Sequence, residues 1–382
     1  MQKPTTSPPT LRSEAPVDSS GVLLTVDLDA LAENYRRLNR LSDRANCAAV
    51  VKANAYGLGI VRVAPALHRA GCRTFFVATF AEATGLRDIF DANSQDAEVF
   101  VLNGISVHDS ALAQERRLVP VLNSLEHVAT WRTSAAGQPE VAIHVDTAMS
   151  RLGLSIAAAT HLLGQSGLYE DLHVTALLSH LACSEKPDHP LNRQQLERFS
   201  ALRKGLPPLR AGIANSSGIF LGPEFRFDLV RAGVALYGAN PTPDHPNPMS
   251  EVINLKGKII QTQQIDRGMT VGYGAAFTAT RPMRLATVPV GYADGYARAL
   301  GNRGFGEIGG VRVPVVGRVS MDLTVFDVTD VAPGIAVPGS YIQLIGGAVS
   351  LDEVAKAAET ISYEILVRLG PRLERNYVGT AE

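Results

Sequence analysis

Short runs of apolar residues alternate with amphipathic segments from Leu28 to about Pro248. Eight of the runs present apolar residues to both sides, which is typical of buried parallel strands. The runs are Cys47–Val51, Phe75–Thr79, Val99–Leu102, Leu118–Leu122, Val141–Val145, Val174–Ser179, Arg210–Ala214 and Asp228–Val230. Helical spacing separates them, and a further helical segment, Leu28–Leu41, precedes the first run. Eight strands in a β-then-α order predict an α/β fold of the TIM-type (β/α)8 barrel kind.

The pattern changes after about Ser250, where short and often alternating segments are separated by glycine and proline. These segments are Val252–Gln263, Arg284–Val290, Val311–Val316, Leu323–Val328 and Tyr341–Ile345. They predict a C-terminal mainly-β domain, followed by a helix from Leu351 to about Leu369. We interpret the glycine-rich stretch Gly301–Gly310 as a loop, because it lacks the lysine and the strand–helix context of a phosphate-binding loop.

These patterns divide the chain into three parts. Residues 1–20 are rich in Pro, Ser and Thr without an apolar stretch and are expected to be a disordered extension. Residues 21–250 are expected to form the barrel, and residues 251–382 the β domain. The first 20 residues also lack the apolar core of a secretory signal, so we expect a cytoplasmic protein.

Composition excludes several classes of function. The formal net charge is −1, which gives no reason to expect nucleic acid or an anionic membrane as a partner. No apolar run reaches the roughly 18 residues that suggest a membrane span. The three cysteines are scattered without metal-ligand spacing, so we expect neither a structural metal nor a disulfide framework. Hydrophobic residues make up 46% of the chain and charged residues 19%, which fits a soluble globular enzyme.

Polar residues suited to chemistry follow the predicted strands. They are Lys52, Asp146, His180, Asn215 with Ser216, and Arg231 with Gly233. In barrels of this type the active site lies at the C-terminal ends of the strands, so these residues predict the site. Lys52 at the end of a buried strand would be partly desolvated, which lowers its pKa and frees the amine for Schiff-base chemistry. The alternative is a lysine that extends to solvent from a strand end.

The run VVKANAYGLG, which contains Lys52, resembles the cofactor-lysine signature of the alanine racemase family, a fold-type III group of pyridoxal-phosphate enzymes. Further segments resemble family blocks in the same order along the chain. They are HVDTAMSRLG, LLSHLA, ANSSG and LVRAGVALYG in the barrel, and VGYGAAF, VGYADGY and VGRVSMD in the β domain. The resemblance extends from about Leu24 to Tyr377. No single block is decisive, but the ordered set is highly specific.

The resemblance implies a homodimer in which each active site is built from both subunits. Lys52 would hold pyridoxal 5'-phosphate and act as the base on one face of the cofactor, and Tyr273 of the partner subunit would be the base on the other face. A racemase needs two such bases, because inversion takes a proton from one face and returns it to the opposite one. Without the resemblance, a tyrosine in a Gly-Tyr-Gly loop is more often a turn or packing residue.

The resemblance also assigns cofactor contacts. Tyr56, Ser216 and the backbone amides of Gly233 and Val234 would bind the phosphate, although a serine pair alone is more often an ordinary loop or helix cap. Arg231 would face the pyridine nitrogen; the alternative is a structural arginine paired with a carboxylate. An arginine keeps its proton and cannot hand it to the pyridine.

Other residues are placed around the cofactor and the substrate. His180 would pack on the cofactor ring, although a histidine that ends an apolar strand is otherwise usually a core residue, and Asn215 would also contact the cofactor. Arg151 would bind the cofactor's phenolic oxygen and the substrate carboxylate. That carboxylate would also be bound by the Met321 amide and Tyr292 of the partner subunit. An entrance corridor would be lined by Glu185, Arg298 and Arg318, which could equally form exposed ion pairs.

Three positions depart from the family pattern. His144 stands where many members have a carbamylated lysine that supports the arginine, so Arg151 must be oriented by another group or anion. Ser320 stands where cysteine is frequent. A C-terminal tyrosine that touches the phosphate in some members aligns with about Pro371, which leads us to expect lower phosphate affinity or a compensating contact.

We therefore predict an alanine racemase that serves either peptidoglycan synthesis or D-alanine catabolism. A broader amino-acid racemase, acting on serine or lysine, is the closest alternative. A non-catalytic pyridoxal-phosphate carrier would lack the β domain and Tyr273. A fold-type III decarboxylase would have an acidic residue in place of Arg231 and a cysteine in place of Tyr273.

Overall fold

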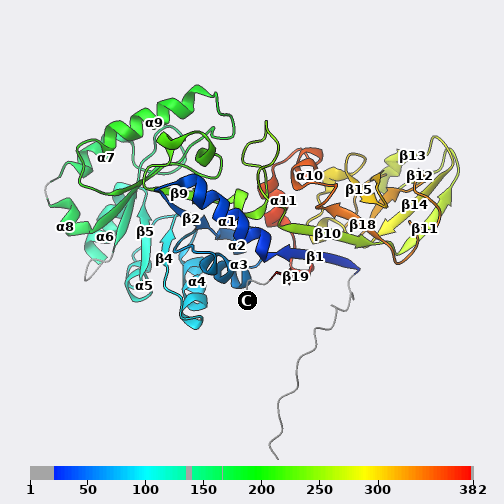
Figure 1. Cartoon of the computed structure of the whole chain (residues 1–382), viewed down its shortest axis with the longest axis horizontal. Coiled ribbons are helices and arrows are strands. Elements are labelled where there is room, and N and C mark those ends of the chain that lie inside the picture. The colour runs from blue at the N-terminus through cyan, green and yellow to red at the C-terminus, as the bar shows by residue number, and fades with distance from the viewer. Residues whose placement is uncertain (1–20, 135–139, 166, 380–382) are drawn as a thin grey trace, which may run out of the picture.

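A computed structural model of the chain describes residues 21–134, 140–165 and 167–379. It has two lobes, a barrel and a mainly-β domain, arranged along the long axis of the molecule (Figure 1). The predicted disordered extension over residues 1–20 lies outside the described residues.

Eight parallel strands form the barrel wall, in the order β8-β7-β6-β5-β4-β3-β2-β9. Their bounds are β2 Asn46–Val50, β3 Thr74–Val77, β4 Glu98–Val101, β5 Leu118–Leu122, β6 Val141–His144, β7 Val174–Leu178, β8 Arg210–Gly212 and β9 Leu229–Ala232. Backbone hydrogen bonds bring β9 back to β8: Asp228 N–H donates to the Ala211 carbonyl at 3.0 Å, and Arg231 N–H to the Ala214 carbonyl at 2.9 Å. The predicted barrel and its eight strands are confirmed.

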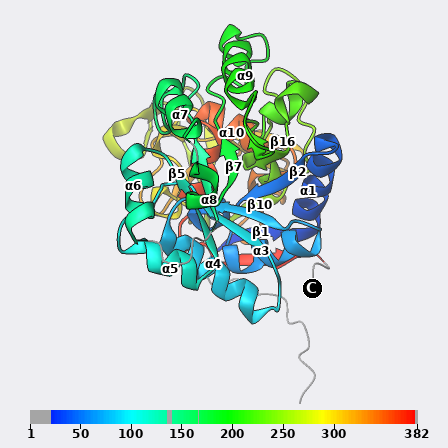
Figure 2. The same cartoon turned by 90° about the vertical axis from the view of Figure 1, so that its left-hand side faces the viewer.

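Helices surround the barrel, as the end-on view shows (Figure 2). They are α1 Leu28–Ser42, α3 Ile60–Arg69, α4 Phe80–Ala92, α5 Asp109–Glu115, α6 Leu125–Ser134, α7 Ile156–Leu163, α8 Leu168–Leu172 and α9 Pro190–Arg203. The short element α2 (Lys52–Tyr56), which follows β2, is a left-handed turn. The buried residues of α4, for example, recur at helical spacing (Phe80, Ala83, Leu86, Phe90), so one face of that helix packs inward.

The β domain contains the remaining strands. They are β10 Ile253–Lys258, β11 Gln261–Ile265, β12 Thr270–Val271, β13 Phe277–Thr278, β14 Met283–Val288, β15 Phe305–Ile308, β16 Val311–Pro314, β17 Thr324–Asp327, β18 Tyr341–Ile345 and β19 Arg375–Val378. The strand β1 (Val22–Asp27), at the start of the chain, pairs antiparallel with β10 and parallel with β19. The first strand therefore belongs to the sheet of the β domain, β16-β15-β18-β10-β1-β19, and ties the barrel to it.

Three predictions for the C-terminal half need correction. The segment Val252–Gln263 forms two strands, β10 and most of β11. The stretch Gly301–Gly310 is not all loop, because β15 lies in it and continues through a turn at Gly309 and Gly310, both with positive φ, into β16. The helix predicted from Leu351 is two helices, α10 (Leu351–Ala357) and α11 (Ser362–Arg368), because Glu359 adopts φ 56° and ends the first.

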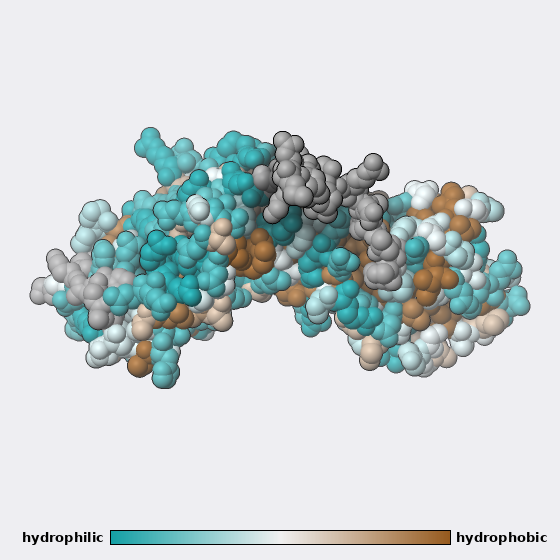
Figure 3. All heavy atoms as spheres, turned by 90° about the horizontal axis from the view of Figure 1, so that it is seen from below, coloured by the Kyte–Doolittle hydropathy of each residue, from teal (hydrophilic) through white to brown (hydrophobic). Residues whose placement is uncertain are grey.

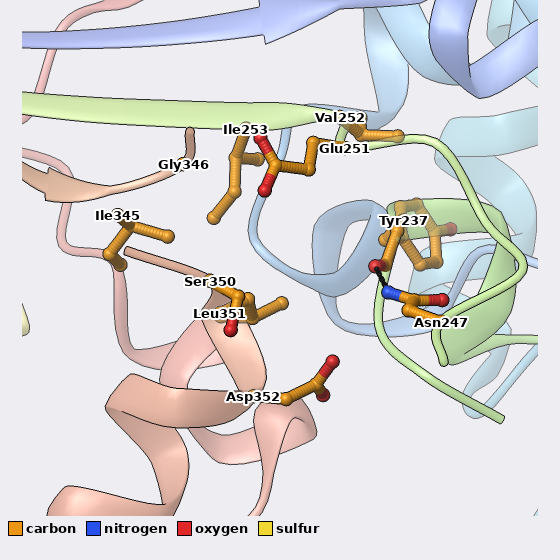
Figure 4. Close-up of a pocket in the computed structure, with 11 residues that line it drawn as sticks. Tyr237, Asn247, Glu251, Val252, Ile253, Ile345, Gly346, Ser350, Leu351 and Asp352 are labelled. Atoms are coloured by element: carbon orange, nitrogen blue, oxygen red, sulfur yellow. Dashed lines mark hydrogen bonds between the residues drawn. The ribbon is translucent and has the colours of Figure 1, made fainter. Parts of the chain in front are cut away.

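The junction between the lobes fixes where α11 lies. Asp352 in α10 accepts hydrogen bonds from Asn240 N–H on a barrel loop (3.1 Å) and from the hydroxyl of Ser362 (2.5 Å). Beside it a pocket of about 20 Å³, lined among others by Tyr237, Asn247 and Asp352, has room for about one water (Figure 4). The contact holds the start of α11 near the barrel.

The part of the chain that the structure describes contains no helix long and apolar enough to cross a membrane. The face seen from below has hydrophobic patches mainly on the β domain, while the barrel side is mostly hydrophilic (Figure 3).

Candidate active site

A cavity of about 680 Å³ opens at the C-terminal ends of the barrel strands. Its size suits a small cofactor with its substrate. Eight of the predicted site residues line it: Lys52, Tyr56, Arg151, His180, Asn215, Ser216, Arg231 and Gly233. Val234 is buried next to Gly233, outside the lining. The rule that barrel sites lie at strand ends thus brings these residues together.

Lys52 begins an unusual turn. The four residues after it, Ala53, Asn54, Ala55 and Tyr56, all have φ of 53° to 54°. This left-handed conformation costs a non-glycine residue about 1–2 kcal/mol, so four in a row persist only with support from their surroundings. Strain of this kind concentrates at functional sites.

Contacts from three directions support the left-handed turn. The Glu82 carboxylate in α4 accepts the N–H of Ala53 at 2.7 Å and that of Ala78 at 2.8 Å. The Asn54 side chain accepts Ile60 N–H at 2.9 Å. Near the C-terminus, Arg375 Nε donates to the Gly57 carbonyl at 2.8 Å. The sequence analysis missed Glu82, because its Thr79–Glu82 spacing is that of an ordinary helix capping box.

Burial lowers the pKa of Lys52, as the sequence analysis predicted. The neighbouring positive charge of Arg151 lowers this pKa further, and the Glu82 carboxylate raises it. A lower pKa leaves more of the amine neutral, which is the nucleophilic form. The geometry therefore disfavours the alternative of a lysine extended into solvent.

Three groups that could bind a phosphate lie together in one wall of the cavity: Tyr56, Ser216 and Gly233. The hydroxyl of Tyr56 is so close to Gly233 that a Cβ on this glycine would lie 2.6 Å from it. Ser216 is 1% exposed, and its Oγ accepts the N–H of Gly233 at 2.9 Å. The Tyr56 ring stacks on Tyr237 with centroids 4.6 Å apart, which fixes its direction. Backbone amides and hydroxyls of this kind fit an anion such as a phosphate.

A second tyrosine reaches the same wall. Tyr363 on α11 lines the cavity with its ring centroid 5.9 Å from that of Tyr56, and burial raises its pKa to about 12. Pro371, which the sequence analysis aligned with the family's C-terminal tyrosine, does not line the cavity. The cavity thus has a C-terminal tyrosine, eight residues earlier, which fits the second of the two expectations, a compensating contact.

Arg231 is held by neutral groups. Its guanidinium donates to the carbonyls of Gly212 (3.0 Å) and Ser179, and lies 3.4 Å from His180 Nδ1. Among the described residues no carboxylate forms an ion pair with it, which disfavours a structural salt bridge. Burial lowers the pKa of Arg231 to about 10, so the side chain stays protonated at neutral pH.

His180 is neutral in this setting. Burial and the charges of Arg231 and Arg151 hold its pKa well below the usual range. A neutral imidazole can accept a hydrogen bond from Arg231 at Nδ1 and keep its proton on Nε2, which is then free to donate. Asn215 accepts the hydroxyl of Ser184 at 2.8 Å and thereby fixes the loop beside Ser216.

His144 makes a specific contact at the position where many family members have a modified lysine. Its Nδ1 lies 2.8 Å from Oδ1 of Asn123, whose amide nitrogen donates to the carbonyls of Leu102 and Val121. Nδ1 therefore carries the proton. Burial, with the charge of Arg231, lowers the pKa of His144 to about 4, so its other nitrogen is an unprotonated acceptor in the cavity wall.

The loop after β6 carries Arg151 back over the cavity. Asp146 accepts the backbone N–H groups of Ala148, Met149 and Ser150, and the chain then rejoins β6 where Leu154 N–H donates to the His144 carbonyl at 2.8 Å. This folded loop, fixed by a carboxylate, places Arg151 at the cavity together with His144.

The residues predicted to serve the partner lie elsewhere. Tyr273 is 73% exposed, Tyr292 42% and Met321 54%, and none of them lines the cavity around Lys52. All three are on turns of the β domain.

Ser320 is the residue that stands where cysteine is frequent in the family. It closes the turn before Leu323, since its hydroxyl donates to the Leu323 carbonyl at 2.7 Å.

The predicted corridor residues all have exposed side chains. Glu185 lies near Tyr363 and raises its pKa, and the guanidinium of Arg318 lies beside Gly274 in the Tyr273 loop. Arg298 begins a short 3-10 helix, η6 (Arg298–Leu300). None of the three forms an ion pair with another residue in the described part of the chain.

The mouth of this parallel barrel brings together a partly desolvated lysine, a cradle suited to a phosphate and an arginine that has no carboxylate partner. These features define the class of barrel enzymes that hold a phosphorylated aldehyde cofactor on a lysine. The residues fit such a group, because the hydroxyls of Tyr56 and Ser216 could bind its phosphate and the Lys52 amine is available for its carbonyl.

Comparisons with known proteins specify the family. The model of the alanine racemase N-terminal domain matches residues 26–241, and that of the alanine racemase C-terminal domain matches residues 252–377. The alanine racemase of Rhodospirillum rubrum is 48% identical over 369 residues, which cover 96% of this chain and 98% of the relative. The chain therefore belongs to the alanine racemase family.

Other relatives agree. A catabolic alanine racemase of Mesorhizobium japonicum is 45% identical, with 94% of each chain covered, and a biosynthetic one of Agrobacterium fabrum is 44% identical, with 93% of each covered. The crystal structure of the Bartonella henselae alanine racemase, with covalently bound pyridoxal phosphate, is similar with a TM-score of 0.88. It is 39% identical and covers 94% of this chain and 99% of its own.

Proposed function

We propose that this protein interconverts L-alanine and D-alanine, using pyridoxal phosphate held covalently by Lys52. The observation that carries the proposal is the cavity at the barrel mouth, where a lysine of lowered pKa lies in one wall with the Tyr56, Ser216 and Gly233 cradle. The membership of this chain in the alanine racemase family supports racemisation of alanine as the reaction. When bound, the cofactor supplies an electron sink that acidifies the α-proton of the amino acid.

Two bases would move the α-proton. The Lys52 amine takes or gives a proton on one face, and Tyr273 of the partner subunit does so on the other. The high exposure of Tyr273 in the single chain supports this assignment, because the phenol is available to a second molecule.

Arg231 would direct the outcome. Its pKa of about 10 keeps the proton on the guanidinium, so Arg231 would face the ring nitrogen of the cofactor as a hydrogen-bond donor and would not protonate it. The electron sink would then be weaker, which would favour return of the proton to the α-carbon over transamination.

The substrate carboxylate would be bound by Arg151 from one chain, with Tyr292 and the Met321 amide of the partner subunit. His144 would orient Arg151 through its unprotonated Nε2. Asn123 fixes the imidazole ring by accepting the proton on the other nitrogen, Nδ1. Glu185, Arg298 and Arg318 would line the entrance corridor.

This division of labour requires a homodimer in which the β-domain turns with Tyr273, Tyr292 and Met321 complete the partner's site. The barrel, with Tyr363 from α11 in the same chain, binds the cofactor. We also propose that the enzyme works in the cytoplasm.

Incubation with L-alanine in deuterium oxide tests the reaction. We expect D-alanine that carries deuterium at the α-carbon, because the proton returned to the opposite face comes from solvent-exchanged groups. The Lys52→Ala variant should lose both this activity and the visible absorbance of bound cofactor. Wild-type protein that forms no D-alanine, or a variant with unchanged absorbance, would refute the proposal.

A further inference from the structure

The two turns that carry Tyr292 and Met321 are joined through their backbones. Tyr292 N–H donates to the Ser320 carbonyl at 3.1 Å, and Ala293 N–H to the Met321 carbonyl at 3.0 Å. Gly291 is needed at this junction, because a Cβ there would collide with the same two carbonyls. The turns that position the Tyr292 hydroxyl and the Met321 amide are thus joined into one backbone unit.

A buried carboxylate fixes the first turn from within. Asp294 ends the 3-10 helix η5 (Tyr292–Asp294) and is only 3% exposed. Its Oδ2 accepts Gly291 N–H at 2.9 Å, which closes the turn on itself, and its backbone carbonyl accepts Gly370 N–H at 3.0 Å. The segment after α11 is therefore attached to the turn that carries Tyr292.

One arginine from that segment connects both turns. Nε of Arg372 lies 3.1 Å from Oδ1 of Asp294, and its NH1 lies 2.7 Å from Oδ1 of Asp322, the residue after Met321. The planar guanidinium offers donors in a fixed fork, so it sets the distance between the two carboxylates in a way that an ammonium cannot. Both carboxylates raise the pKa of Arg372, which therefore stays charged.

From this geometry we propose that Arg372 is a positioning residue for binding of the substrate carboxylate. It acts through Asp294 and Asp322 on Tyr292 and Met321, and it touches neither substrate nor cofactor. Tyr292 and Met321 are 42% and 54% exposed, so packing within their own chain holds them only in part. The bridge from Arg372 to Asp294 and Asp322 is therefore needed to fix the two turns. The inference rests on the proposed function, in which these two residues bind the carboxylate of alanine.

A purely structural role predicts something different. Arg372 is half exposed, but its partner Asp294 is buried, so loss of the arginine leaves a buried carboxylate unpaired and lowers stability. A purely structural role predicts this loss of stability with no change in substrate binding. A positioning role predicts that substrate binding weakens as well.

The test uses full-length, cofactor-loaded protein. In Arg372→Ala we expect the KM for both L- and D-alanine to rise about tenfold while kcat changes less than about threefold, because binding of the carboxylate is lost more than proton transfer. Propionate, which has the carboxylate but no amine, should bind about tenfold more weakly by isothermal titration calorimetry. The melting temperature should fall in Arg372→Ala, because the buried Asp294 carboxylate loses its partner, and Arg372→Lys should restore KM only in part.

The chain offers a matched control. Arg281 bridges Asp330 at 3.1 Å and Asp327 at 3.8 Å, one carboxylate exposed and the other mostly buried. It lies in the bend between β13 and β14, and Asp327 is at the opposite end of β17 from Met321. Arg281→Ala should leave KM and propionate binding unchanged.

Two results would overturn the role of Arg372: an Arg372→Ala variant with wild-type KM and propionate affinity, or equal effects from Arg281→Ala. If Arg372→Ala fails to fold, Asp322→Asn removes only the outer ion pair and is measured in the same way, with wild-type values again overturning the role. Failure of the proposed function is distinct, since wild-type protein would then neither racemise alanine nor bind propionate.

Discussion

Replacing Glu82 by glutamine tests whether the strained Lys52 turn is sustained by a single carboxylate. Glu82 accepts Ala53 N–H with one oxygen, and Ala78 and Thr79 N–H with the other. Glutamine keeps one acceptor and places an NH2 group against the other donors, so at least one N–H loses its partner.

The expected cost follows from these contacts. Loss of a hydrogen bond to a charged group costs about 1–3 kcal/mol. The same change removes the negative charge that raises the pKa of Lys52, so that pKa should fall further below its ordinary value. Glu82→Gln should thus lower the free energy of unfolding by about 1–3 kcal/mol and shift the titration of Lys52 to lower pH.

Two assays report these effects. Urea unfolding of the loaded protein gives the change in stability. The rate at which the apoprotein regains visible absorbance with added pyridoxal phosphate, followed against pH, reports the neutral fraction of Lys52. The control is Glu353→Gln, because Glu353 occupies the same capping position in α10 without a left-handed turn beside it, and it should cost less than about 1 kcal/mol. Equal losses in both variants, or an unchanged or higher midpoint in Glu82→Gln, would refute the reasoning.

Three further outcomes are expected. Gly233→Ala would place a Cβ 2.6 Å from the Tyr56 hydroxyl, so the Kd for pyridoxal phosphate should rise at least about tenfold in a fluorescence titration, and an unchanged Kd contradicts the cradle. Tyr296→Phe removes a buried hydroxyl for which the described residues offer no partner and should keep or raise the melting temperature, whereas Tyr237→Phe loses a 3.0 Å hydrogen bond and should cost about 1 kcal/mol; equal losses would count against this contrast. The pKa of His144 falls to about 4 on folding, so the unfolded chain binds a proton that the native chain does not, and the free energy of unfolding should decrease from about pH 6.5 toward pH 4, by up to about 3 kcal/mol from this residue. His144→Gln should flatten that slope in urea unfolding, and an unchanged slope would exclude His144 as its source.

The barrel could be predicted because its strands are buried on both faces and therefore stand out as short apolar runs. The strand Val22–Asp27 was missed. Its partners β10 and β19 lie more than 200 residues away, and the local sequence pattern does not indicate that the segment pairs with them. The division of the last helix depends on one residue, Glu359, whose left-handed conformation is invisible in a polar–apolar pattern.

The site was predicted where strand ends and family blocks coincide, as at Lys52, His180 and Arg231. Residues that act from a distance were not: Asn123 fixes His144 across two strands, and Tyr363 reaches the cavity only because α11 folds onto the barrel. Such contacts arise from tertiary packing, which the spacing of residue types does not encode.

Mixing two inactive variants tests the central claim most directly. Lys52→Ala and Tyr273→Phe chains are each expected to be inactive or nearly so as purified proteins. If every site combines the lysine of one chain with the tyrosine of another, random pairing of the two variants should restore about a quarter of wild-type activity, because half of the dimers would contain one intact site. Activity that stays at the level of the separate variants after subunit exchange has been verified would contradict the account.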